Sequence, residues 1–438
     1  MENQMKESYD AIIIGAGVIG AAITLELARK GLKSICVDKV GEAGHGSTAG
    51  SCALIRPFYS TLDGAAIAWE SHYYWSKWAE HLGVEDERGL IRYVNCGNLV
   101  FKSELNNNMV PVMSILNQLG CPYDELSMDE VVARYPFVSR SSFTPVRKVD
   151  DPDFGAPNGE ELDGAVFFPH GGYVTDPALS AHNLLRAAEA AGATFRLNTK
   201  VTAICKAQGR VSGIKIDGGQ EIVAPVVVNV AGPHSFKINA MAGVEDDMAI
   251  KTRALRHEVA HVPSPIGLDF ETHGGHLSDS DTSVYCRPES GNHILIGSED
   301  PECDERIWVD PDDFDRSFSN QWQLQVMRLA QRIPELKIPT KLKGVVELYD
   351  VSDDWIPIYD KSGLPGFYMA IGTSGNQFKN APIVGEMMAD LITACETGHD
   401  HDAKPVTFHL KNIDRTISLG FYSRKREVNQ QSSFSVRG

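Results

Sequence analysis

The chain has 438 residues, of which 42% are hydrophobic and 23% are charged, and its formal net charge is −17 at pH 7. This length predicts two domains, and the acidic balance argues against nucleic acid or an anionic membrane as a partner. The eight cysteines are scattered without a CxxC pair, so they predict no metal site and no redox disulfide. Because Met1–Ser8 is polar and no apolar run reaches the ~20 residues of a membrane span, we expect a cytoplasmic protein without a transmembrane segment.

A dinucleotide-binding pattern opens the chain. The apolar run 9–14 predicts a strand that leads into Gly15-x-Gly17-x-x-Gly20 and an apolar helix over 18–30. In this pattern the first glycine permits a tight turn, the second lets the backbone approach a pyrophosphate, and the third lets the helix pack closely on the sheet. Asp38 follows the next predicted strand, 33–37, where an acid is placed to bind a ribose diol.

A second loop rich in glycine and hydroxyl groups, 41–51, follows almost at once. A nicotinamide-binding half would continue here into a helix and another strand. Backbone donors and hydroxyls beside the first loop instead suit the longer contact surface of a flavin dinucleotide. The alternative is a flexible surface loop.

The rest of the chain alternates between two kinds of segment. We expect helices over 67–83, 178–191, 312–332 and 381–397, with Trp69, Tyr73, Trp75 and Trp78 in the core rather than at a cofactor. Strands are expected at 194–197, 201–206, 210–216, 221–223, 226–233, 255–262, 282–287, 293–296 and 367–372. This order predicts an α/β (α+β overall) protein with a discontinuous FAD-binding domain (8–83, 164–235 and 360–400), a substrate or cap domain with a mixed or antiparallel sheet (84–163 and 236–359), and a C-terminal extension (401–438).

Several motifs together resemble the D-amino-acid oxidase superfamily of FAD enzymes, especially its branch of sarcosine oxidase (including β-type subunits) and glycine oxidase. Besides the first glycine motif, they are Gly46-Ser47-Thr48 through Arg56, Asn229-Val230-Ala231-Gly232, Asp354 through Ile358, and Gly372-Thr373-Ser374-Gly375-x-x-Phe378-Lys379. The resemblance implies a glutathione-reductase-type Rossmann domain and non-covalent FAD. The FAD contacts expected from the motifs and the resemblance are Gly15, Gly17, Val18, Ile19, Gly20, Asp38, Lys39, Gly46, Ser47, Thr48, Ser51, Val201, Ala231, Gly232, Gly372, Gly375, Asn376, Gln377, Phe378 and Lys379.

The resemblance also implies where the substrate binds. Family members commonly hold a substrate carboxylate with an arginine and a lysine, and the matching positions are Arg56 and Lys379. Two cations converging on one site would be costly unless an anion completed them, which agrees with this assignment. Tyr349 matches a tyrosine that lines the substrate cavity in relatives; the alternative is a half-buried core tyrosine.

Other family positions differ. Leu295 stands where some oxidases have a lysine over the flavin, so fast reaction with oxygen is not expected, and His293 nearby is a poor substitute. Glu347 stands where some relatives attach flavin through a cysteine, which excludes that linkage. His45 is expected to be a solvated loop residue or a phosphate neighbour rather than an attachment point.

These features predict an FAD-dependent enzyme that oxidises the carbon–nitrogen bond of a small carboxylate-bearing amine, an N-methyl or other secondary amino acid, by hydride transfer to flavin N5 and hydrolysis of the imine. Two alternatives stay open: an FAD-dependent 2-hydroxy acid dehydrogenase, and a flavin-holding subunit of a larger amine dehydrogenase or oxidase. Oxygen, a quinone or a carrier protein would accept the electrons, and a partner subunit or homo-oligomer is possible. The segment 416–438, with Arg424-Lys425-Arg426, either docks a partner or packs on its own domain.

Overall fold

The computed structural model describes residues 7–438. Its first layer is a six-stranded sheet in which five strands are parallel and the edge strand β20 is antiparallel. In spatial order the strands are β10 (Thr194–Arg196), β3 (Ser34–Val37), β2 (Ala11–Ile14), β14 (Val226–Asn229), β21 (Phe367–Ile371) and β20 (Ile358–Lys361). The central strands are fully buried, which is why they read in the sequence as continuous apolar runs.

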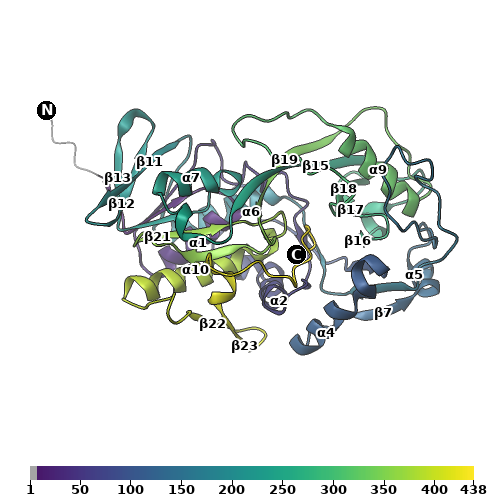
Figure 1. Ribbon diagram of the computed structural model, residues 1–438, viewed down its shortest axis with the longest axis horizontal. Helices are drawn as coiled ribbons and strands as arrows, with labels where there is room; N and C mark the ends of the chain where they lie inside the picture. Colours follow the sequence, from purple (N-terminus) through teal and green to yellow (C-terminus); the bar gives the residue numbers. More distant parts are fainter. Residues whose placement is uncertain (1–6) are drawn as a thin grey trace.

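Both faces of this sheet are covered. Helix α1 (Val18–Arg29) lies against α6 (Pro177–Ala190) and α10 (Ala381–Glu396) on one face (Figure 1). Ala11 and Ile13 of β2 point into that core, whereas Ile12 and Ile14 alternate to the other face. There they meet α7 (Ser235–Ala242) and a small sheet of β1 (Glu7–Ser8), β13 (Glu221–Val223), β12 (Arg210–Ile216) and β11 (Val201–Ala207).

A mixed eight-stranded sheet forms the other half of the molecule (Figure 1). All its neighbouring strands are antiparallel except β16 and β6. In spatial order they are β19 (Gly344–Ser352), β15 (Thr252–Pro263), β18 (His293–Ser298), β17 (Val284–Glu289), β16 (His276–Asp279), β6 (Asn98–Phe101), β8 (Gly164–Phe168) and β7 (Asp124–Ser127). The helices α5 (Met128–Arg134), α8 (Phe270–His273) and α9 (Asn320–Arg332) share a hydrophobic core with this sheet.

The remaining elements connect these layers. They are α2 (Leu62–Ser76), α3 (Trp78–Leu82), α4 (Val110–Leu119), the three-stranded sheet β4 (Leu54–Ile55), β9 (Gly172–Val174) and β5 (Tyr93–Val94), and the hairpin β22 (Thr407–Leu410) and β23 (Arg415–Ser418). Short 3₁₀ helices span Glu104–Met109, Asp217–Gly219, Gly232–His234, Glu245–Asp247, Phe378–Asn380 and Leu419–Tyr422.

Two predicted helices differ from the structure. The helix predicted over 312–332 begins at Asn320, because Ser319 caps its N-terminus and the preceding residues form a loop. The helix predicted over 67–83 begins at Leu62 and is interrupted at Lys77, where the backbone leaves helical geometry. The strand predicted over 282–287 begins only at Val284, because Ser283 adopts a positive φ of 59°.

Buried aromatic residues fill the core beside α2, as predicted. Trp69, Trp75 and Trp78 are all buried, and Trp75 stacks on Trp78 with ring centroids 4.5 Å apart. Tyr73 is half-buried at the edge of the same cluster. These aromatics therefore stabilise packing and do not reach the cavity described below.

The mixed α/β fold class is confirmed, and the placement of one segment refines the proposed domain division. Residues 164–168 form β8, which pairs with β6 and β7 in the eight-stranded sheet rather than with the six-stranded one. We therefore propose to move this strand into the substrate domain. Of the two alternatives for segment 416–438, docking a partner or packing on its own domain, the structure supports packing on its own chain. Tyr422 and Arg424 of this segment are fully buried.

Residues 1–6, which contain most of the polar N-terminal stretch, lie outside the described residues. Among residues 7–438, no helix combines the length and the apolar character needed to cross a membrane.

Candidate functional site

A cavity of about 430 Å³ lies where the two large sheets meet. Its walls come from the glycine turn after β2, the loop after β3, the β14–α7 connection, strands β16, β17 and β19, Glu299 after β18, the β21–α10 connection and the last residues of the chain. Every residue predicted to contact FAD lines this cavity except Gly372. Arg56 and Tyr349 line it as well.

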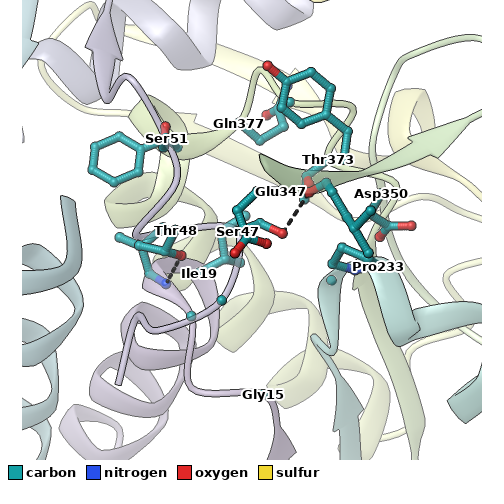
Figure 2. Close-up of a pocket in the computed structure, with 18 of the residues that line it drawn as sticks. Gly15, Ile19, Ser47, Thr48, Ser51, Pro233, Glu347, Asp350, Thr373 and Gln377 are labelled. Carbon is teal, nitrogen blue, oxygen red and sulfur yellow. Dashed lines mark hydrogen bonds between the residues drawn. The ribbon is translucent and has the colours of Figure 1, made fainter. Parts of the chain in front are cut away.

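The first glycine motif forms one end of the cavity (Figure 2). Gly15 has a φ of +116°, and a Cβ atom there would lie 2.3 Å from the carbonyl oxygen of Val230. A Cβ atom on Gly20 would lie 1.9 Å from the carbonyl oxygen of Gly15, so only glycine lets α1 approach the turn. The predicted conformational roles of Gly15 and Gly20 are therefore confirmed.

The N-terminus of α1 opens toward the same end. Gly17, the N-cap residue, has no side chain to cap the helix, and the backbone N–H of Val18 donates to Thr48 Oγ1 at 3.2 Å. A helix N-terminus lined by glycine is suited to bind an anionic phosphate. The loop after β3 is fixed in turn by Ser47, whose hydroxyl donates to the carbonyl oxygen of Leu348 at 2.7 Å, as the dashed lines in Figure 2 show.

Asp38 and Lys39 lie at the end of β3. The Asp38 carboxylate accepts hydrogen bonds from the backbone N–H groups of Ala16 at 2.6 Å and Val40 at 3.0 Å, which fixes its position on the cavity wall. The Lys39 ammonium donates to Asp312 at 2.9 Å and lies 2.8 Å from the His234 ring. Lys39 thus connects this wall to the loop that precedes α9.

The β21–α10 connection forms another wall. Gly375 has a φ of +69°, and a Cβ atom there would lie 2.6 Å from the Tyr349 ring. Gly372 lies just outside the cavity, and its N–H donates to Asp350 Oδ2 at 2.6 Å. Gly372 therefore reaches the cavity only through Asp350, and a direct contact with FAD stays a prediction.

Arg56 and Lys379 converge on the ring of Tyr59. Arg56 Cζ lies 4.8 Å from the Tyr59 ring centroid, and Lys379 Nζ lies 5.0 Å from it and donates to the hydroxyl at 3.0 Å. Both cations are buried, and burial lowers the pKa of both. The nearby charge of Arg56 lowers the pKa of Lys379 further. Among residues 7–438 neither side chain forms an ion pair; Arg56 donates instead to the carbonyl oxygens of Phe58, Val436 and Arg437.

Tyr349 lies on β19 and contacts His257 of the neighbouring strand β15. Its ring stacks on His257 with centroids 4.4 Å apart, and His257 Nε2 lies 2.9 Å from Asp300 Oδ1. Burial raises the pKa of the Tyr349 hydroxyl, so the phenol stays neutral. Tyr349 lines the cavity, while its role toward a substrate stays a prediction.

Four cavity or near-cavity residues were missed by sequence reasoning. Tyr59 follows Arg56 closely in the chain, and Asp350 follows Tyr349, so proximity to a predicted residue was the available signal. His276 and Glu299 gave no such signal, because each reaches the cavity from a separate strand or strand end. Burial, Arg56 and Lys379 together hold the pKa of His276 well below its usual range, which keeps the imidazole neutral.

Three buried polar atoms on the cavity wall have no hydrogen-bond partner within residues 7–438. They are His276 Nδ1, Asp350 Oδ1 and Asn376 Nδ2. Burial raises the pKa of Asp350 to about 7, the hydrogen bond from Gly372 opposing the effect. Unpaired buried groups of this kind are costly unless a ligand completes them. Together with the glycine turn and the open helix N-terminus, they fit a large polar cofactor such as a flavin dinucleotide.

The remaining sequence expectations fall on or near the cavity. Leu295 and His293 lie on β18 outside the cavity lining. Leu295 packs against a small buried cluster that includes Tyr285, and His293 contacts His261 with ring centroids 4.8 Å apart. Glu347 lines the cavity, and burial raises the pKa of its carboxyl. His45 also lines the cavity, half-exposed and 3.4 Å from Glu42.

One cluster away from the cavity bears on the expectation that there is no metal site. Potential ligand atoms of Asp86, Glu87 and His182 lie within 4.8 Å of one another. The Asp86 carboxylate, however, accepts from Asn183 at 2.6 Å and lies 2.7 Å from His182 Nδ1. These hydrogen bonds account for the cluster, and the absence of a metal stays a prediction.

A parallel sheet with a glycine turn at a helix N-terminus, opening into a cavity shared with a second sheet, is the arrangement of a dinucleotide-binding site. Comparison with known proteins identifies the class. The FAD dependent oxidoreductase family (DAO) matches residues 10–391, so the chain belongs to this family, its cofactor is FAD, and the family expected from the sequence is confirmed.

The relatives agree with this assignment. Glycine oxidase of Geobacillus kaustophilus is 24% identical over 93% of this chain and 99% of its own length. Sarcosine oxidase subunit beta of Rhodobacter capsulatus is 23% identical over 88% of this chain and 85% of its own length. The crystal structure of L-proline dehydrogenase from P. horikoshii superposes with a TM-score of 0.74 at 22% identity, covering 89% of this chain and 95% of that one, which shows the shared fold.

Proposed function

We propose that this FAD-dependent oxidoreductase oxidises the carbon–nitrogen bond of a small amine that bears a carboxylate, an N-methyl or other secondary amino acid. The observation that supports this most directly is the pair of buried cations, Arg56 and Lys379, on the cavity wall without an acidic partner among residues 7–438. A substrate carboxylate would supply the missing charge. The names of the relatives, a glycine oxidase, a sarcosine oxidase subunit and an L-proline dehydrogenase, agree with such a substrate.

Each of the two cations has a distinct part in binding. The planar Arg56 guanidinium can donate two parallel hydrogen bonds to a carboxylate, and Lys379 adds a point charge beside it. Because burial and Arg56 lower the pKa of Lys379, an arriving carboxylate would also favour the charged form of this lysine. Substrate charge and Lys379 protonation are therefore coupled in this proposal.

The same two cations favour the neutral, reactive form of the substrate amine. A positive field and low solvent access disfavour a second cation, so the substrate amine would bind in its neutral form. The neutral His276 ring on the same wall adds no competing charge. FAD, when bound at the glycine turn, supplies a hydride acceptor, and hydrolysis of the resulting imine completes the oxidation.

The cofactor would be held by the residues predicted from the sequence. Gly15, Gly17 and the N-terminus of α1 would hold the pyrophosphate, and Asp38 a ribose. Asp350 Oδ1 and Asn376 Nδ2 would complete their hydrogen bonding on the same group. We also propose a cytoplasmic location, a partner subunit or homo-oligomer, and oxygen, a quinone or a carrier protein as the electron acceptor.

The test is an anaerobic half-reaction of the purified holoenzyme with sarcosine, L-proline and larger N-methyl amino acids, with matched 2-hydroxy acids in parallel. Loss of the oxidised flavin absorbance with the amines supports the proposal; loss with the hydroxy acids alone would replace it by the dehydrogenase alternative. Arg56→Lys and Lys379→Ala should each raise the substrate concentration for half-maximal reduction about ten- to a hundredfold, because each removes charge-assisted hydrogen bonds. The exposed Lys341→Ala serves as the control, and unchanged half-saturation in both cavity variants would exclude the clamp.

A further inference from the structure

The chain's own last residues occupy the part of the cavity beside Arg56. Arg56 donates to the carbonyl oxygen of Val436 at 3.1 Å and to that of Arg437, and the Ser60 N–H donates to Gly438 at 2.9 Å. Figure 1 shows this end of the chain between the two halves of the molecule. The guanidinium proposed to bind a substrate carboxylate is therefore held here by main-chain carbonyls.

The side chain of Arg437 occupies a second position in the same region. Its Nη1 donates to Ser280 Oγ at 2.8 Å, and its Nε lies 3.7 Å from Glu299 Oε2. Glu299 lines the cavity and its side chain is only 2% exposed. Ser278 and Ser280 donate to its two carboxylate oxygens at 2.6 and 2.9 Å.

A buried carboxylate of this kind favours a cationic partner. The two serines orient Glu299 but bring no charge, and an uncompensated buried charge is costly. Among residues 7–438 its one ion-pair partner is Arg437, whose side chain is 29% exposed and lies in a segment without helix or strand. The partner thus comes from a part of the chain that few regular backbone hydrogen bonds hold in place.

One arginine residue consequently spans two sites at once. Its carbonyl oxygen is bound by Arg56, and its guanidinium reaches Ser280 and Glu299. A free amino acid with a cationic side chain has the same layout. It would bind more strongly at the first position, because a carboxylate accepts charge-assisted hydrogen bonds from Arg56 where the chain offers only a neutral carbonyl.

We propose that Ser278, Ser280 and Glu299 form a subsite for a cationic side chain, that the substrate is an amino acid with a guanidinium or ammonium group at its far end, and that Arg437 fills this subsite until such a substrate displaces it. The inference rests on the proposed function, since it takes Arg56 as the carboxylate site. Ligand binding at the subsite, however, requires no oxidation, so the two proposals are tested separately.

The probe is 5-guanidinopentanoate, which keeps the carboxylate and guanidinium of arginine but has no α-amine to oxidise. Its neutral isostere, 5-ureidopentanoate, is the comparison, and binding to the full-length holoenzyme is measured by calorimetry and by perturbation of the flavin absorbance spectrum. The guanidino acid is expected to bind at least about tenfold tighter than the ureido acid, because only the guanidino acid forms a charge-assisted hydrogen bond with Glu299.

Two variants identify the residues responsible. Glu299→Gln should remove the preference for the guanidino acid, while the exposed Glu302→Gln should keep it. Arg437→Ala should tighten binding of both acids about tenfold and keep the preference for the guanidino acid, because either acid must displace the Arg437 side chain from the subsite. Since Arg437 is partly exposed, this variant tests the proposal even if Glu299→Gln does not fold.

The outcomes separate the two proposals. Equal affinities for the two acids, or weaker binding of both in Arg437→Ala, would overturn the cationic subsite and make Arg437 an additional carboxylate ligand. A clear guanidino preference supports the subsite even if no secondary amino acid reduces the flavin, in which case the proposed oxidation alone fails. Flavin reduction by neutral amino acids without any guanidino preference supports the oxidation and overturns the subsite.

Discussion

Asp350 shows how one buried residue links the cavity to stability. It was not singled out in the sequence, yet it lines the cavity, fixes Gly372 and retains one carboxylate oxygen without a partner in the described part of the chain. Its surroundings oppose ionisation, and burial raises its pKa to about 7 from an ordinary value of 3.8. Such an environment is typical of a group positioned for a ligand rather than for stability.

The raised pKa predicts how Asp350→Asn changes stability with pH. Between about pH 4 and pH 7 the folded protein keeps a proton on Asp350 that the unfolded chain has lost, so the contribution of this residue to stability falls as pH rises. Above that window the wild type bears the full penalty of a buried charge. Asp350→Asn should therefore increase the free energy of unfolding of the flavin-free protein by up to about 4 kcal/mol near pH 8, and by little near pH 4.

Urea unfolding at both pH values measures this difference. The exposed Asp246→Asn is the control for loss of a carboxylate as such. A stability gain that is the same at both pH values would contradict a raised pKa at Asp350.

At the scale of elements, the loop between β18 and α9 closes one side of the cavity. Pro311, Asp312, Phe314 and Arg316 of this loop line it. Asp312 accepts from Lys39 at 2.9 Å and from Lys237 of α7 at 2.7 Å, so it joins the loop to two elements of the FAD-binding side. Hydrogen bonds from these lysines hold the pKa of Asp312 far below its usual range, so it stays charged.

This arrangement predicts weaker FAD binding in Asp312→Asn. Because Asp312 is about two-fifths exposed, each ion pair contributes little, on the order of 0.2–1 kcal/mol. The Kd for FAD should rise about three- to tenfold in low salt, measured by flavin fluorescence titration of the apoprotein. In high salt, which screens these pairs, the two proteins should converge.

The neighbouring Asp313→Asn is the matched control, since Asp313 is exposed and lies outside the cavity lining. If both variants bind FAD like the wild type, the loop does not help to hold the cofactor.

At the scale of the whole molecule, Arg424 joins the C-terminal extension to the half that contains the six-stranded sheet. Its fully buried guanidinium contacts Asp360 of β20 at 3.0 Å, Asp402 after α10 at 2.9 Å and Asp247 before β15 at 2.5 Å. Three carboxylates around one buried arginine are stable only while the arginine is present. The basic run that suggested a partner surface therefore fixes the chain's own extension.

Arg424→Ala should lower the free energy of unfolding by about 3–5 kcal/mol, because it leaves the fully buried Asp360 carboxylate without its arginine. Lys425→Ala removes an adjacent but half-exposed charge and should cost no more than about 1 kcal/mol. Urea unfolding of both variants measures the contrast. Equal losses would mean that the network does not stabilise the junction.

The sequence predicted well those features that depend on neighbours along the chain. The strand before Gly15, the helix after Gly17 and the buried aromatics of α2 follow from local periodicity and from glycine geometry. It failed where distant charges intervene. The helix predicted from Asp312 begins only at Asn320, where Ser319 caps it, and Asp312 lies in the preceding loop, paired with lysines far away in the sequence.

By itself, then, the sequence determined the fold class and the dinucleotide-binding turn, since motif spacing encodes a local backbone geometry that a cofactor requires; its resemblance to a known family gave the FAD-binding family, which is confirmed, and the clamp residues, which stay a prediction. Only the tertiary structure showed that Arg56 meets Tyr59 and Lys379, and that Arg437 reaches Glu299 across the cavity. The contacts of Lys379 with Tyr59 and of Arg437 with Glu299 join residues more than about a hundred positions apart, and no periodicity or spacing specifies which distant side chains a folded chain brings together.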